Sequence, residues 1–175
     1  WMDLYVCAAM SNEAEKRKNI LYINQGLDKN GVPQFRDKAP EYGLNDDTHT
    51  TMAAFFDYDK DGDLDLYLMY YMLNGPNANT IFPRDRGGRS PPNDKLYRND
   101  GILPGASHPV FTDVTLAAGI KEDGYGLGLV ISDLNNDGWP DIYVANDFLS
   151  NDMLWLNNRD GTFTECGIES GVGNI

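Results

Sequence analysis

The chain has 175 residues, 41% of them hydrophobic, with 27 acidic against 14 basic side chains and a formal net charge of −13. This composition is typical of one folded, mostly β domain and excludes a disordered tail, and no apolar run approaches the ~20 residues of a transmembrane segment. The excess of carboxylates argues against a nucleic-acid partner, because such binding depends largely on Lys and Arg that replace the counterions of phosphates.

The first predicted element is the segment DLYV at residues 3–6. It has the pattern of the segments DLYL and DIYV that follow two acidic loops farther along the chain, so the sequence is expected to start inside a repeat. Two more anchors of the repeat follow it in order. The first is LYIN, LYRN or LWLN, and the second is FRD, FTD or FTE.

The acidic loops are the most distinctive repeated feature. DYDKDGDLD at residues 57–65, called the first loop, returns as DLNNDGWPD at residues 133–141, the second loop, with the glycine in the same place. Spacing between the anchors repeats as well. The offset from phenylalanine to glycine is eight residues in Phe35–Gly43, Phe111–Gly119 and Phe163–Gly171.

Four short apolar segments make up each repeat. One precedes the acidic loop (52–56; 127–132), one follows it (64–70; 142–145), and the LYxN and FxD anchors supply the other two. They are rich in branched and aromatic residues and are bounded by Gly, Asn or Asp, which is typical of strands. Four strands per repeat predict the four-stranded antiparallel blades of a β-propeller, with an open array of three stacked sheets as the alternative.

This interpretation divides the chain into three units. Residues 1–50 would hold the last three strands of one blade and an inter-blade loop, and residues 51–126 a full blade with an insertion at 69–95. Residues 127–175 would hold another full blade and the start of the next inter-blade loop. Propellers close with about 4 to 8 blades, so we expect this chain to be a piece of a larger ring.

The alternating aspartates predict two Ca²⁺ sites. Side chains at positions 1, 3, 5 and 9 of a tight loop, with a backbone carbonyl at position 7, can converge on a hard cation, and the glycine at position 6 permits the turn. The predicted ligands of the first loop are Asp57, Asp59, Asp61, the Asp63 carbonyl and Asp65. Those of the second loop are Asp133, Asn135, Asp137, the Trp139 carbonyl and Asp141.

The sequence of the loops fits other cation-binding motifs less well. An EF-hand needs a bidentate glutamate at position 12 and flanking helices, whereas Leu68 and Val144 stand there inside predicted strands. Magnesium rarely occupies an all-protein cage, which favours calcium. An acidic turn that is only solvated remains the alternative for each loop.

DYDKDGDLDLYL, LYRNDG, FTDVTLAAGI and LNNRDGTFTE together resemble the FG-GAP or VCBS repeats of integrin-α-type propellers, closest to the cartilage-acidic-protein and ASPIC/UnbV-like branch. The resemblance covers nearly the whole chain. It implies an all-β, seven-bladed propeller with Ca²⁺ in the loop between the first and second strands of a blade. It also implies a role in adhesion or ligand binding, with ligands on the face opposite the calcium loops.

The largest departure from the repeat lies on that opposite face, between residues 68 and 96. Loops longer than about 12 to 15 residues without secondary structure are often functional, and aromatic and arginine side chains are enriched in contact patches. We therefore expect a surface for an anionic glycan or a partner protein, formed by Tyr70, Tyr71, Phe82, Arg84, Arg86 and Arg89. A solvated loop is the alternative.

The leading functional hypothesis is a calcium-binding, non-catalytic scaffold that is extracellular, on the cell surface or periplasmic. The alternatives are the propeller body or accessory module of a polysaccharide lyase or hydrolase, and a structural subunit of a surface complex. No HExxH, GxSxG or phosphate-loop motif supports catalysis. Cys7 and Cys166 favour two buried thiols over a disulfide.

Overall fold

The computed structural model describes residues 1–9, 11–73, 85–147 and 149–173. Three short helical turns are present in this part of the chain, at η1 (Ala14–Lys16), α1 (Ala39–Tyr42) and α2 (Gly167–Ser170). The strands form three antiparallel sheets. They are β1 (Leu4–Val6), β2 (Ile20–Leu27) and β3 (Pro33–Asp37); β4 (Thr50–Phe56), β5 (Asp65–Tyr70), β6 (Lys95–Asn99) and β7 (Phe111–Asp113); and β8 (Gly126–Ser132), β9 (Asp141–Asn146), β10 (Met153–Asn157) and β11 (Phe163–Glu165).

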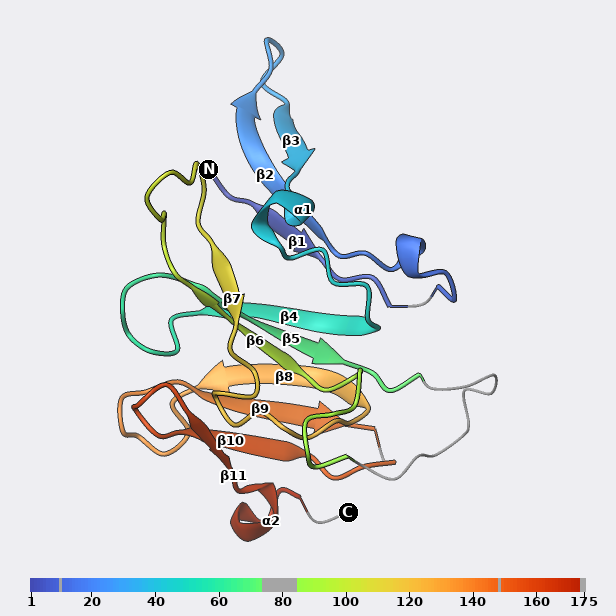
Figure 1. The fold of residues 1–175 in the computed structure, drawn as a ribbon, viewed down its shortest axis with the longest axis vertical. Helices are drawn as coiled ribbons and strands as arrows, with labels where there is room; N and C mark the ends of the chain where they lie inside the picture. The colour runs from blue at the N-terminus through green and yellow to red at the C-terminus, as the bar shows by residue number, and fades with distance from the viewer. Residues whose placement is uncertain (10, 74–84, 148, 174–175) are drawn as a thin grey trace.

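This arrangement confirms the predicted all-β class with blade-like antiparallel sheets (Figure 1). Within each sheet the strands are ordered as in the chain, so neighbouring strands are also consecutive in sequence. The second and third sheets have the same register, with Leu66 opposite Tyr97 and Ile142 opposite Trp155. The three sheets do not form a closed barrel within the described residues.

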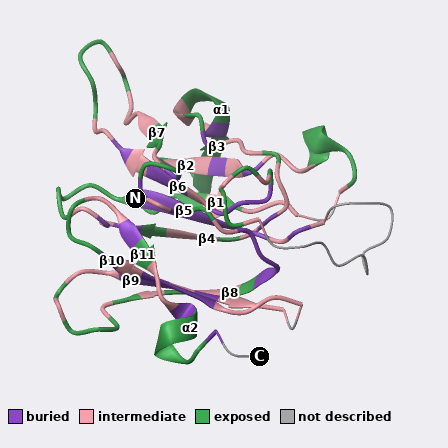
Figure 2. Cartoon of the chain, turned by 60° about the horizontal axis from the view of Figure 1, so that its bottom comes forward, coloured by how far each residue is buried: buried purple, intermediate pink, exposed green. Residues whose placement is uncertain are grey.

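Burial explains why β5 is apolar at nearly every position. The hydrophobic layer between the second and third sheets includes Tyr67 and Met69, whereas the layer between the first and second sheets includes Leu66, Leu68 and Tyr70. Successive side chains of a strand point to opposite faces, so β5 supplies both layers and all six of its residues are buried. In Figure 2 the buried residues follow the strands between the sheets, and most connecting loops are exposed or half-buried.

The repeated offset of eight residues ends at a backbone conformation that favours glycine. Gly43, Gly119 and Gly171 have φ angles of 70°, 84° and 86° and end the short turns that follow β3, β7 and β11. At Gly119 an added Cβ would lie 2.9 Å from the Phe163 carbonyl oxygen, so a side chain would also collide with the neighbouring sheet. Glycine is therefore required there for two independent reasons.

The strand bounds lie close to the predicted segments. β4 starts at residue 50 and β8 at residue 126, each one residue before the start of its predicted unit. The connection from β5 to β6 covers residues 71–94, of which 74–84 lie outside the described part. Among the described helices, none is long and apolar enough to span a membrane.

Candidate metal centre

Both acidic loops lie at the same end of the sheets. The first loop joins β4 to β5 and the second joins β8 to β9, both on the left in Figure 1. Each loop has positive φ angles at positions 4 and 6, which are 61° and 98° at Lys60 and Gly62 and 58° and 89° at Asn136 and Gly138. Both loops share this backbone path, and in each the N–H of the glycine at position 6 donates to the aspartate at position 1.

The first loop gathers three carboxylates. One oxygen from each of Asp57, Asp59 and Asp61 lies within 4.8 Å of the others. Asp57 Oδ2 accepts the Gly62 backbone N–H at 3.1 Å, whereas Asp57 Oδ1 is buried and has no hydrogen-bond partner among the described residues. Burial, followed by the Asp61 charge, raises the pKa of Asp59. A buried, unpartnered carboxylate oxygen beside two further carboxylates fits the oxygen preference of Ca²⁺.

Asp65, predicted as the position 9 ligand, holds the loop to the sheet. Its side chain is fully buried, and its two oxygens accept the backbone N–H groups of Tyr58 at 3.1 Å and Asn99 at 2.8 Å. Burial raises the pKa of this carboxyl group to about 6. Each carboxylate oxygen has two lone pairs, so these bonds leave one lone pair per oxygen for a cation. The Asp63 side chain is exposed, and only its carbonyl was predicted to bind.

The second loop has the same framework with more internal bonds. The Asp133 oxygens accept the N–H groups of Asp137 at 2.9 Å and Gly138 at 2.8 Å. Asp141 repeats the role of Asp65 by accepting the N–H groups of Leu134 and Asn157, each at 2.9 Å. The loop therefore keeps its shape through carboxylate bonds to its own backbone.

Asp137 has several donors in this loop. Its Oδ1 accepts the Trp139 N–H at 2.8 Å, and its Oδ2 accepts the Asn135 side-chain amide at 2.9 Å. Arg159 reaches the same Oδ2, with Nη2 at 2.9 Å. The Trp139 N–H, followed by the Arg159 and Asn135 side chains, lowers the pKa of Asp137. The side-chain oxygens of the second loop are also suitable ligands for calcium. One of them, Asp137 Oδ2, is already in contact with the Arg159 guanidinium group.

Two asparagines of the LYxN anchor complete this end of the sheets, and sequence reasoning did not assign them a role. Asn99 Nδ2 donates to the Leu64 carbonyl and Asn157 Nδ2 to the Pro140 carbonyl, each at 3.2 Å. Their recurrence at the same repeat position was a signal for this role. Asn157 Nδ2 also donates to the Tyr58 carbonyl at 2.8 Å, which joins the third sheet to the first loop.

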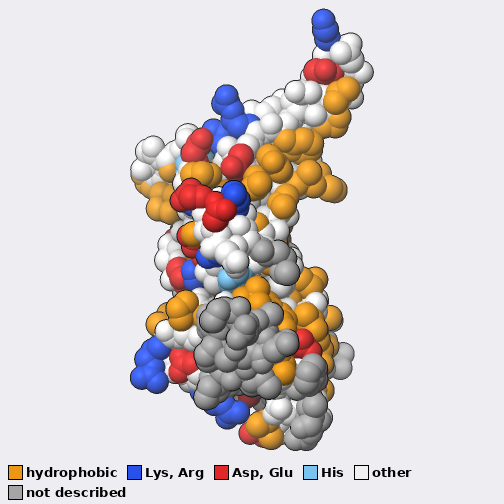
Figure 3. Space-filling model, turned by 90° about the vertical axis from the view of Figure 1, so that its right-hand side faces the viewer, with side chains coloured by type: hydrophobic (Ala, Val, Ile, Leu, Met, Phe, Trp, Pro, Cys, Tyr) orange, Lys and Arg blue, Asp and Glu red, His pale blue; other side chains and the backbone are white. Residues whose placement is uncertain are grey.

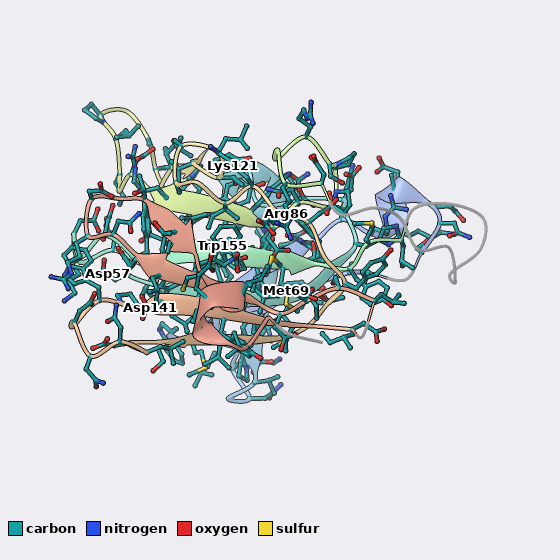
Figure 4. All side chains as sticks on the ribbon, turned by 90° about the horizontal axis from the view of Figure 1, so that it is seen from below. Asp57, Met69, Arg86, Lys121, Asp141 and Trp155 are labelled. Carbon is teal, nitrogen blue, oxygen red and sulfur yellow. The ribbon has the colours of Figure 1, made fainter. Side chains whose placement is uncertain are left out.

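The predicted contact surface is only partly assembled. Tyr70 is fully buried in the layer between the first two sheets, so it is not available to a surface ligand. Tyr71 is half-buried and donates its hydroxyl to Asp147 Oδ2 at 3.0 Å. Phe82 and Arg84 lie outside the described residues. Figure 4 places Asp57 and Asp141 at the left of the sheets and Arg86 toward the right, with Trp155 between them.

Arg86 and Arg89 belong to a compact turn at residues 85–90. Asp85 Oδ2 accepts the N–H groups of Arg89 at 2.7 Å and Ser90 at 3.0 Å, and Gly88 N–H donates to the Lys121 carbonyl at 2.8 Å. The Arg89 side chain is 86% exposed. This part of the long connection is therefore held by hydrogen bonds from its backbone N–H groups to the Asp85 carboxylate and to the Lys121 carbonyl.

Arg86 also lines a cavity of about 170 Å³ at this end. Its Nε lies 3.9 Å from Glu122 Oε2, and its side chain is 59% exposed. The other lining residues come from three connections and are Met72, Asp123, Gly124, Tyr125, Leu149, Ser150 and Asn151. Figure 3 faces this side of the molecule and shows Lys and Arg side chains on its lower half.

The two cysteines are free and half-buried. Burial raises the pKa of Cys7 to about 11 and also raises that of Cys166. The two cysteines are therefore unpaired thiols, as expected, but they are half-buried instead of buried.

Comparison with known families matches residues 133–174 to the model of the FG-GAP-like repeat. No curated protein matches the chain. The match starts at Asp133, the first acidic residue of the second loop, and covers β9, β10, β11 and α2. The chain therefore carries a repeat of the FG-GAP-like family, which covers its second acidic loop and the last three strands of the third sheet.

Proposed function

We propose that the chain is part of a calcium-stabilised, non-catalytic binding scaffold that works outside the cytoplasm. The observation that carries this proposal is the first loop, where Asp57 Oδ1 is buried without a hydrogen-bond partner in the described part of the chain. It lies beside the carboxylates of Asp59 and Asp61. A divalent cation would neutralise this cluster and give the buried oxygen a partner.

Calcium would act on stability. Asp57, Asp59, Asp61 and the Asp63 carbonyl would hold the ion, and Asp65 would add a lone pair while it ties the loop to β6. An ion that binds the folded loop and not the unfolded chain stabilises by about 2.7 kcal/mol at a hundredfold excess over Kd. A site of moderate affinity would stay empty in resting cytosol, which supports an extracytoplasmic location.

The ligand of the scaffold would bind at the opposite end, near Arg86. The cavity there brings together three connections, and the guanidinium group at its wall is more than half exposed. A carboxylate or sulfate of a glycan or protein partner has the charge and the acceptor geometry that an arginine binds. The sheets would hold this end rigid while calcium stabilises the other.

Thermal unfolding in saturating Ca²⁺ and in EGTA tests the calcium proposal. We expect a rise in Tm with Ca²⁺ that Asp61→Ala reduces strongly. Asp63→Ala is the matched control, because the exposed Asp63 side chain is lost while its carbonyl stays in the loop. An equal Tm in both buffers, with Asp61→Ala unfolding like the parent, would show that the first loop is only a solvated turn.

Binding to heparin, a sulfated glycan, tests the ligand end. We expect retention on immobilised heparin at low salt, weakened by Arg86→Ala, with no retention on uncharged dextran. Arg36→Ala, which removes an exposed arginine from β3, is the charge-matched control. Equal loss in both variants would point to general charge attraction instead of a site at Arg86.

A further inference from the structure

Arg159 lies in the turn between β10 and β11 of the third sheet. Its Nη2 and Nε lie 2.9 Å and 3.2 Å from Asp137 Oδ2, at the centre of the second loop. Asp137 is nearly buried, with 11% of its side chain exposed. The ion pair therefore places one full positive charge on a carboxylate that was predicted to bind calcium.

The equivalent position in the second sheet is Gly101. Asn99 Oδ1 accepts the Gly101 N–H at 3.0 Å, and Asn157 Oδ1 accepts the Arg159 N–H at 2.8 Å. The φ angles are 69° at Gly101 and 67° at Arg159, so both residues have left-handed backbone. An ideal Cβ built on Gly101 would lie 3.3 Å from Asp63 Oδ2, so this position faces the acidic loop in that sheet as well.

The first loop has no cation in comparable contact among the described residues: the charge of Arg98 acts on Asp59, but its guanidinium group pairs with Asp100 at 2.7 Å. Within the described residues, no lysine or arginine forms an ion pair with Asp57, Asp59 or Asp61. One of its carboxylate oxygens lacks a partner, whereas both Asp133 oxygens of the second loop accept backbone N–H groups. The two loops thus share a backbone path, but a guanidinium group contacts a predicted calcium ligand only in the second loop, as far as the described residues show.

We propose that Arg159 is a built-in counter-cation that takes the place of a metal ion in the second loop. The proposal rests on the proposed function in one respect, because it compares the calcium affinities of two loops. Calcium at the second loop must displace the guanidinium group from Asp137 and share the site with its charge. Within the described residues, no guanidinium group contacts a predicted calcium ligand of the first loop, so calcium displaces none there. The chain therefore has one open divalent-cation site and one that is closed from within.

Calorimetric titration of the 175-residue chain with Ca²⁺ tests this proposal in two backgrounds. The parent measures the first loop, and the Asp61→Asn variant isolates the second. In the Asp61→Asn background we expect Arg159→Gly to tighten calcium binding at least tenfold. Glycine suits the left-handed backbone there, so the variant should stay folded. Arg159→Lys, which keeps a positive charge, is the matched control and should leave the second loop weak.

The outcomes separate this inference from the proposed function. A parent that binds one ion at the first loop, with a second ion bound only after Arg159→Gly, supports both. A parent that binds one ion, with less than a twofold change on Arg159→Gly, overturns the inference and leaves the proposed function standing. A parent that binds no ion, with binding at the second loop after Arg159→Gly, supports the inference alone. Absence of binding in every variant overturns both.

Discussion

The two ends of the second and third sheets differ in how closely they repeat. At the loop end, Asp65 and Asp141 each accept one N–H from their own loop and one from the third strand of the sheet. At the opposite end, the connections after β5 and β9 have very different lengths, at residues 71–94 and 147–152. The repeat is therefore strict at the aspartates that accept buried backbone N–H groups, and variable in the length of the connection between the second and third strands.

The largest expected effect is at the loop end. Asp65→Ala leaves the N–H groups of Tyr58 and Asn99 without their acceptor, and each buried unsatisfied donor costs about 1–3 kcal/mol. We expect Asp65→Ala to lower the free energy of unfolding by about 3 kcal/mol in EGTA, measured by urea titration, and Asp141→Ala to match it. The exposed Asp63→Ala should cost under about 0.5 kcal/mol. A similar loss of stability in Asp63→Ala would contradict the conclusion that the aspartate at position 9 stabilises the fold by accepting these N–H groups.

A smaller effect is expected at the opposite end, from Asp94 and Asp152. Asp94 is fully buried and accepts hydrogen bonds from the Tyr67 hydroxyl and the Tyr70 N–H, each at 2.8 Å. Asp152 is half-buried and accepts the corresponding bonds from the Tyr143 hydroxyl and the Asn146 N–H. We expect Asp94→Ala to cost about 2 kcal/mol and Asp152→Ala about half of that. Urea titration of both variants measures the difference. Equal costs would show that burial does not set the strength of this pair.

The second sheet has an ion pair that the third sheet lacks, and its stability should depend on pH. Lys95 Nζ lies 2.6 Å from Asp46 Oδ2, and the residue equivalent to Lys95 in the third sheet is Met153. Burial opposes ionisation of Asp46, but the hydrogen bond and charge of Lys95 outweigh it and lower the pKa of Asp46 below its usual value of about 3.9. A depressed carboxyl pKa adds stability above pH ~4 that is lost as the pH falls through the folded value.

Exchanging Lys95 for the residue of the third sheet tests this pair. We expect Lys95→Met to cost about 1–2 kcal/mol at pH 7, because Asp46 then keeps its buried charge without the lysine. The acid-side decline in stability between pH 5 and pH 2 should become shallower, as measured by urea titrations across that range. Asp46→Asn with Lys95→Met should recover part of the loss. If stability depended on pH in the same way in Lys95→Met as in the parent, Lys95 would not be the cause of the lowered pKa of Asp46.

The smallest expected effect on stability is from Arg86. Its contact with Glu122 is long, at 3.9 Å, and its side chain is 59% exposed, so the ion pair contributes little. We expect Arg86→Ala to change the free energy of unfolding by under about 0.5 kcal/mol. The same urea titration measures it. A loss above 1 kcal/mol would make Arg86 a structural residue of the turn instead of a ligand contact.

Much of the fold could be predicted because the chain contains an internal sequence repeat. The repeated acidic loops and anchors located the strands of the second and third sheets to within about two residues, and the offset to Gly43, Gly119 and Gly171 anticipated a fixed turn. The burial of Tyr70 was missed, because a sequence pattern does not show that β5 lies between two hydrophobic layers.

The site was predicted less completely than the fold. Spacing found the acidic residues of both loops, but it treated the two loops as equal. The contact between Arg159 and Asp137 joins residues 22 positions apart, across the β8–β9 and β10–β11 turns, so only the folded sheet brings them together. The glycine at position 101 was the available signal, since its partner in the other repeat is an arginine.

Both faces of β5 are covered by a hydrophobic layer, and this should set the order in which parts of the protein unfold locally. Separating the first sheet from the second exposes one hydrophobic layer, and separating the third exposes the other, but β5 loses its cover only after both have left. Backbone amides of β5 should therefore exchange with deuterium more slowly than those of β1 or β11. Local unfolding would start at the first and third sheets and reach β5 of the second sheet last.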